Sequence, residues 1–227
     1  MTARATLFAS IRRSLGVTGD ELARRAAVAE RIAQHPRGVI PARGQLPPQA
    51  RTELFAQMVE AASGTAEILG SAADVPAAVT ALLRRHNLPM QIRRGDDPRL
   101  AALPWSEQRT LEVTTGASDG RQLVAVSHAF GGVAETGTLI MASGPDNPTT
   151  LNFLPDTHII VVEAKDIAGD YETVWQRVRE QFGGALPRAI NMITGPSRSA
   201  DIGQILILGA HGPRRLHVLI VGESRVG

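Results

Sequence analysis

The stretch "HIIVVE", residues 158–163, decides the fold class of this chain. It is short, and its four central residues are β-branched aliphatics, which is typical of a strand buried on both faces of a parallel sheet. Similar apolar segments lie on both sides of it in the sequence. Strands are predicted over residues 66–70, 90–93, 110–114, 123–127, 189–193 and 216–221, and residues 132–143 predict a turn that leads into a longer strand.

Apolar residues at helical spacing separate these strands. They predict helices around residues 54–62 and 171–182, and a third helix that begins near Asp74 with Pro76 in its first turn. Strands that alternate with helices predict an α/β fold, with a mostly parallel sheet and helices on its faces. The sequence shows no internal repeat.

The first part of the chain has a different composition. Residues 4–15 and 20–34 predict two helices with only a thin apolar stripe, and residues 35–48 carry four prolines. We therefore expect a helical arm and linker over residues 1–46, followed by an α/β domain over residues 47–227. Residues 1–38 hold seven Arg and three acidic residues. This basic arm is interpreted as a solvated face in preference to a surface that docks a partner.

Composition excludes several kinds of site. The chain has 227 residues and no cysteine, which excludes disulfides, thiolate-bound zinc and iron–sulfur clusters held by its own thiolates. Lys165 is its only lysine, and its aromatic residues are few and scattered, so a nucleic-acid surface is not favoured. Neither a signal-peptide core nor an apolar run of about 18 residues is present, so a cytoplasmic protein without a membrane span is expected.

The first candidate site is the stretch "GPSRSADIGQILILGAHGP", residues 195–213. Gly195 and Pro196 form a rigid loop, Ser197 and Ser199 are able to cap a helical turn, and Arg198 adds a cation that attracts anions. The apolar residues 205–208 predict a buried strand or helix, and a second rigid loop then presents His211. Because ligands bind beyond the carboxyl ends of parallel strands, we expect both loops to face one cleft there. The alternative is that both loops are only turns and that Asp201 is only a capping residue.

The second candidate site is "AETGT", residues 134–138. A carboxylate at Glu135 beside the permissive Gly137 is suited to act as a nucleophile, a base or a ligand anchor, or as a structural lock that accepts backbone N–H groups. The spacing leaves both roles open. His158 is interpreted as a packed core residue, whereas His128 fits either a structural or a functional role. No metal-ligand spacing, Walker A loop or dinucleotide-binding glycine pattern occurs.

Four motifs, "AETGT", "LPDTHIIVV", "GPSRSADI" and "GAHGP", occur in an order and at a spacing that resemble the lactate utilization protein C family, the LutC/YkgG type of LUD domain. The resemblance covers roughly residues 47–225. It implies a Rossmann-like sheet of the NagB/RpiA/CoA-transferase type and a role in oxidising L-lactate to pyruvate beside two iron–sulfur partner proteins. The family usually has an acidic residue directly after "ADI", where this chain has Gly203. The matching positions are Glu135, Thr136, Gly137, Gly195, Pro196, Ser197, Ser199, Ala200, Asp201, His211, Gly212 and Pro213.

The leading functional hypothesis is a cluster-free subunit of a lactate-oxidising system, with no cofactor or metal of its own and with iron–sulfur clusters on its partners. It would bind a small anion, or a partner's surface, in a cleft that includes Glu135, Arg198, Asp201 and His211. Candidate catalytic residues are Glu135, Asp201 and His211, and candidate ligand-binding residues are Thr136, Gly137, Gly195, Pro196, Ser197, Arg198, Ser199 and Gly212.

Two alternatives belong to other classes. In a CoA-transferase-like enzyme, Glu135 would accept the acyl group while Arg198 and the Gly195 loop hold phosphates. In a binding or regulatory module without catalysis, the basic arm would dock acidic partners or nucleic acid.

Overall fold

The computed structural model describes residues 2–200, 206–208 and 211–222 and separates into two compact units, Met1–Val39 and Ile40–Gly227. The first unit contains helices α1 (Ala3–Leu15) and α2 (Leu22–Gln34), which confirms the two predicted helices. Neither helix contains a buried residue, as expected from their thin apolar stripes.

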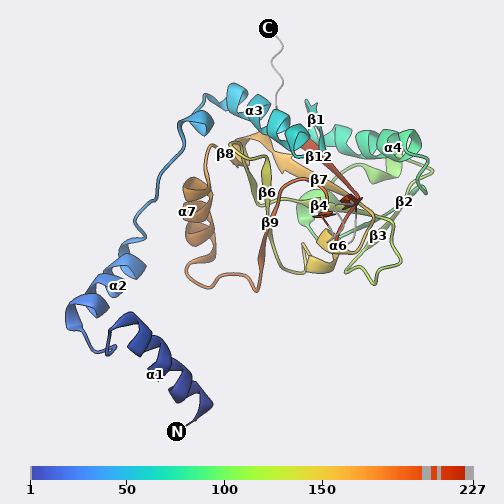
Figure 1. Cartoon of the computed structure of the whole chain (residues 1–227). Helices are drawn as coiled ribbons and strands as arrows, with labels where there is room; N and C mark the ends of the chain where they lie inside the picture. The colour runs from blue at the N-terminus through green and yellow to red at the C-terminus, as the bar shows by residue number, and fades with distance from the viewer. Residues whose placement is uncertain (1, 201–205, 209–210, 223–227) are drawn as a thin grey trace. The chain divides into compact units, whose positions relative to one another are not determined.

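The second unit is built on a six-stranded sheet in which every pair of neighbours is parallel, in the order β1-β12-β7-β4-β2-β3 (Figure 1). The sheet confirms the predicted α/β class. The "HIIVVE" stretch lies at its centre, because β7 pairs with β12 on one side and with β4 on the other. The strands are β1 (Thr65–Leu69), β2 (Gln91–Arg94), β3 (Glu112–Thr115), β4 (Val124–His128), β7 (Thr157–Glu163) and β12 (Arg215–Val221).

Alternation along β7 divides the core between the two faces of this sheet. Ile159 and Val161 pack on one face, against helix α4 (Val75–Arg85) and the short helix α5 (Pro98–Ala101). Ile160 and Val162 pack on the other face, against helix α3 (Pro48–Ala61) and a second sheet. Successive side chains of a strand point to opposite faces of the sheet, so a run of four β-branched residues supplies apolar side chains to the core on both faces.

The second sheet was not predicted as a separate layer. Its order is β8-β5-β6-β9, with strands β8 (Ile167–Ala168), β5 (Gly131–Val133), β6 (Thr138–Ala142) and β9 (Ile190–Ile193). Strand β6 confirms the strand expected within residues 132–143, and β5 precedes it as the other arm of an antiparallel hairpin. Helix α7 (Tyr171–Phe182), predicted at these bounds, buries Val174 and Val178 against Val133 and Ile140 of this sheet.

The remaining described elements include helix α6 (Thr149–Phe153) and two short strands, β10 (Arg198–Ala200) and β11 (Leu206–Leu208). Because β10 pairs antiparallel with β11, the apolar run contains a strand. The expectation that Ser197 and Ser199 cap a helical turn was wrong, since residues 198–200 are extended. Among the described residues, no helix is both long and apolar enough to cross a membrane.

Candidate functional site

The two glycine–proline loops lie against each other. The Ser197 backbone N–H donates to the Pro213 carbonyl over 2.8 Å, and the His211 N–H donates to Ser197 Oγ over 3.4 Å. Gly212 is also close to Ser197, because a Cβ at Gly212 would lie 3.3 Å from the Ser197 Cβ. The structure therefore brings together two motifs that are 14 residues apart in the chain.

A cavity of about 240 Å³ lies beside these loops, and we call it the amino-edge cavity. Its lining includes the polar residues Asn152, His158, Ser197 and His211 and the apolar residues Phe153 and Leu216. His158 and Leu216 are the second residues of β7 and β12, so the cavity lies at the amino-terminal ends of these parallel strands.

This location differs from the predicted one, which was beyond the carboxyl ends of the strands. The reason is the second sheet. Strand β9, which leads into the Gly195 loop, pairs antiparallel with β6 and is not part of the parallel sheet. The other loop, with His211, precedes β12 instead of following it.

Two buried polar side chains of the amino-edge cavity lack partners. Asn152 is 1% exposed, and neither its Nδ2 nor its Oδ1 has a hydrogen-bond partner. His158 is fully buried; its Nε2 lies 2.9 Å from Ser127 Oγ, whereas its Nδ1 has no partner. Burial lowers the pKa of His158 to about 3, so its imidazole is neutral near pH 7. The sequence prediction of a packed, hydrogen-bonded His158 is confirmed.

The "AETGT" turn is anchored to helix α3. Gly137 has φ +67°, and a Cβ there would lie 2.5 Å from the Val59 backbone N. Gly195 has φ +70°, and a Cβ there would lie 2.2 Å from the Ala62 carbonyl oxygen. Both glycines are thus required by a left-handed conformation and by close approach to the end of the same helix.

A cluster of four hydroxyl groups joins this turn to the Gly195 loop. Thr138 Oγ1 lies 2.7 Å from each of the hydroxyl oxygens of Thr136, Tyr171 and Thr194. Thr136 Oγ1 also lies 3.0 Å from the Tyr171 hydroxyl. Thr194 immediately precedes Gly195, so the hydroxyl cluster connects the two candidate sites of the sequence analysis.

The candidate catalytic residues are not all gathered at one cavity. Glu135 is 4% exposed and lines neither the amino-edge cavity nor the second cavity described below. Arg198 is exposed, and its guanidinium donates to the Ser63 hydroxyl. Asp201 and Gly203 lie outside the described residues. A nucleophile must be reached by its substrate, and because Glu135 lines neither cavity, its position gives no support to acyl transfer.

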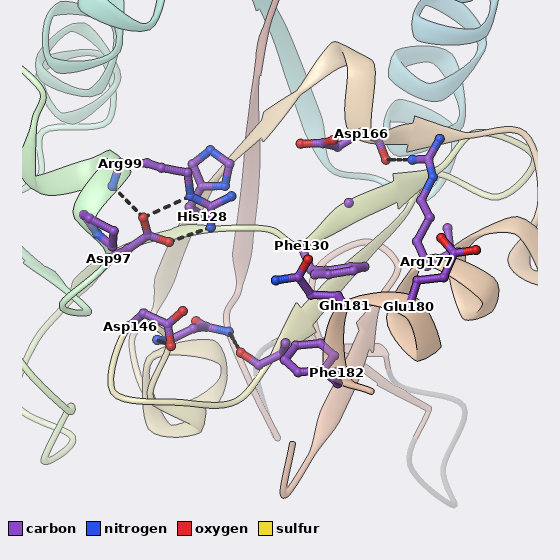
Figure 2. A pocket seen from close by; sticks show the side chains of 15 residues that line it. Asp97, Arg99, His128, Phe130, Asp146, Asp166, Arg177, Glu180, Gln181 and Phe182 are labelled. Carbon is purple, nitrogen blue, oxygen red and sulfur yellow. Dashed lines mark hydrogen bonds and ion pairs between the residues drawn. The ribbon is translucent and has the colours of Figure 1, made fainter. Parts of the chain in front are cut away.

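A larger cavity, of about 700 Å³, lies at the opposite end of the parallel strands, and we call it the carboxyl-edge cavity (Figure 2). His128, the last residue of β4, lines it, as does Asp97, which follows β2. Arg99 donates from Nε and Nη2 to the two carboxylate oxygens of Asp97, over 3.1 and 2.7 Å. Figure 2 shows Asp97, Arg99 and His128 together on one side, with Asp166 and Arg177 apart from them.

His128 is the functional candidate in this cavity that the sequence analysis left undecided. Its Nδ1 lies 2.9 Å from the Ala129 carbonyl oxygen and must carry the proton, whereas its buried Nε2 has no hydrogen-bond partner and lies 3.8 Å from Glu163 Oε1. Burial and the nearby Arg99 lower the pKa of His128. The signal in the sequence was its place at the end of an apolar strand.

The two cavities differ in charge. Two guanidinium groups, of Arg99 and Arg177, line the carboxyl-edge cavity together with four carboxylates, those of Asp97, Asp146, Asp166 and Glu180. At about 6 Å and an effective dielectric constant of about 20, each net negative charge disfavours a bound anion by about 3 kcal/mol. Within the described part of the chain, no carboxylate lines the amino-edge cavity. No three described His, Asp or Glu side chains are placed to hold a metal ion.

Comparison with known proteins identifies relatives. Lactate utilization protein C of Geobacillus thermodenitrificans is 34% identical over 146 residues, which cover 56% of this chain and 61% of the relative. The protein of the same name from Bacillus subtilis is 34% identical over 93 residues, covering 40% and 39%. The chain thus aligns with about three fifths or less of the length of these relatives.

A crystal structure of a DUF162 family protein from Deinococcus radiodurans has the same fold, with a TM-score of 0.61 and 24% identity over 78% of this chain and 99% of that one. The sequence profile of the LUD domain matches residues 52–221, which include the whole parallel sheet and the loops of the amino-edge cavity. The match spans most of the sequence, and this chain therefore belongs to the LUD domain family.

Proposed function

We propose that this chain is the cluster-free subunit of a system that oxidises L-lactate to pyruvate together with iron–sulfur partner proteins. The observation that carries this proposal is the similarity to relatives named lactate utilization protein C, within the LUD domain family. The name belongs to those relatives, and its extension to this chain is the proposal.

The chemistry requires an electron acceptor. Conversion of lactate to pyruvate removes two electrons and two protons, and a protein must pass the electrons to a cofactor or to another protein. This chain has no cysteine with which to ligate an iron–sulfur cluster. Its contribution would be to bind and orient the small anion, or to dock the subunits that carry the clusters.

The two loops whose motifs resemble the family are the proposed binding region. Gly195, Pro196, Ser197, His211 and Gly212 line the amino-edge cavity. Thr136 and Gly137 support this region through the hydroxyl cluster and through helix α3. Glu135 and Arg198 do not line this cavity, and their roles remain part of the proposal, as do those of Ser199 and Asp201.

Reconstitution tests the proposed function. The chain would be produced with the two iron–sulfur proteins that the proposal assigns as its partners. Lactate-dependent reduction of a dye would be measured for the complete set and for each set that lacks one protein. We expect activity only from the complete set. Full activity without this chain, or from this chain alone, would refute its role as a subunit.

A further inference from the structure

We propose that the amino-edge cavity binds a small 2-hydroxycarboxylate, with Asn152 bonded to both its carboxylate and its hydroxyl group. This inference rests on the proposed function for the choice of ligand. It adds a binding residue, Asn152, that the sequence analysis did not assign to a ligand site, and His158 borders the same cavity.

The unpaired side chains are the first argument. An amide offers two N–H donors and one oxygen acceptor, and at Asn152 all of them are buried and unused. Natural proteins rarely leave such groups without a partner, because they lose their hydrogen bonds to water on folding. The unpaired Nδ1 of His158 borders the same cavity. Two unsatisfied side chains at one cavity indicate a polar ligand.

The chemistry of the lining is the second argument. Donors are present at Asn152 Nδ2 and Ser197 Oγ, and apolar surface is present at Phe153 and Leu216. A carboxylate would accept from these donors, while a short alkyl group would pack on the apolar surface. No carboxylate of the described residues lines the cavity, so none of these residues places a like charge beside a bound anion.

The hydroxyl group of the ligand has a specific role. Asn152 Oδ1 only accepts hydrogen bonds, so a ligand must donate to satisfy it. The 2-hydroxyl of lactate is such a donor, whereas propionate has the same carbon skeleton without it. We therefore expect L-lactate to bind roughly tenfold or more tightly than propionate, the effect of one buried acceptor left unpaired.

Calorimetric titration of the full chain with sodium L-lactate tests this site. The variant Asn152→Leu keeps the branched shape of the side chain and removes the amide, and it should weaken L-lactate binding tenfold or more. Thr80→Val is the matched control: it also removes a buried polar group without a partner, but Thr80 lines neither cavity, so the affinity should be unchanged. Circular dichroism establishes that both variants are folded. If Asn152→Leu does not fold, the comparison of L-lactate with propionate on the unaltered chain still decides.

Four outcomes would overturn the inference: no binding of L-lactate, equal affinity for propionate, unchanged affinity in Asn152→Leu, or loss of binding in Thr80→Val. These outcomes are separable from the proposed function. If the complex needs this chain to oxidise lactate but the isolated chain does not bind lactate, the proposed site is wrong and the proposed function stands. If the chain binds lactate through Asn152 but the complex oxidises lactate without this chain, the proposed function is wrong and the proposed site stands.

Discussion

Replacement of Thr138 by valine tests the hydroxyl cluster that joins the "AETGT" turn to the Gly195 loop. Thr138 is fully buried, and its Oγ1 lies 2.7 Å from three other hydroxyl oxygens. One hydroxyl group donates once and accepts twice, so this group uses its full capacity. Valine has nearly the same shape and none of this capacity.

The expected cost follows from the three bonds. A net contribution of about 0.5–1.5 kcal/mol for each gives roughly 2–4 kcal/mol. The loss is reduced because Thr136 and Tyr171 keep their mutual contact at 3.0 Å and the exposed Thr194 is able to bond water. Burial of an additional methyl group returns about 0.8 kcal/mol. We expect Thr138→Val to lower the free energy of unfolding by about 2 kcal/mol.

Thr80 provides a control of the same substitution with the opposite sign. It is 2% exposed within helix α4, and its Oγ1 is buried without a hydrogen-bond partner. Valine removes a buried hydroxyl that makes no bond, so Thr80→Val should stabilise the fold by about 1 kcal/mol.

Differential scanning calorimetry of the full chain measures both changes. For a unit of this size, 1 kcal/mol corresponds to about 2–4 °C, so the thermal midpoint should fall by about 4–8 °C in Thr138→Val and rise by about 2–4 °C in Thr80→Val. Equal stability of Thr138→Val and the unaltered chain would show that the cluster contributes nothing. A similar loss in both variants would show that shape, and not hydrogen bonding, determines the result.

Three further predictions concern other parts of the chain. Gly195→Ala should lower the free energy of unfolding, measured by urea denaturation, by about 2–4 kcal/mol, because strain at positive φ adds to a clash with the end of helix α3. Gly183 has φ +54° and no atom near the position of a Cβ, so Gly183→Ala should lower it by only about 1–2 kcal/mol. Equal losses in the two variants would contradict the clash. Burial lowers the pKa of His158 to about 3 and that of His217 to about 4, so below about pH 6.5 the unfolded state binds more protons than the folded state. The free energy of unfolding should therefore decrease as the pH falls from about 6.5 towards 4, by up to about 1.4 kcal/mol per pH unit for each histidine. A flat profile in thermal unfolding would contradict these pKa values. Deletion of residues 1–39 should leave the midpoint of the main transition within about 2 °C, because neither arm helix buries a residue; a larger fall would contradict the independence of the arm.

The central strands of the parallel sheet were predictable because each is a short apolar run that is buried on both faces. The "HIIVVE" stretch needs no distant information to be recognised as such a strand. The second sheet was not predictable in the same way. Its strand β5 is the three-residue segment "GGV", and β8 contains only Ile167 and Ala168, so neither is long enough to show a period.

The candidate site was predictable only in part. Glycine–proline pairs mark rigid loops in any sequence, and these loops do meet at Ser197 and Pro213. The sequence gives no comparable sign for Asn152, because an asparagine in a short helix resembles any capping or surface residue. Only its burial without a partner distinguishes it, and burial depends on the tertiary structure.

The choice between the two ends of the parallel strands depends on chain direction. The rule that ligands bind at carboxyl ends applies to loops that follow strands of one parallel sheet. The Gly195 loop follows a strand of the second sheet, and the His211 loop precedes β12, so the rule does not apply to either. It does apply to His128 and Asp97, whose cavity carries more carboxylates than guanidinium groups. An anion is therefore better accommodated at the amino end, and a ligand rich in hydrogen-bond donors at the carboxyl end.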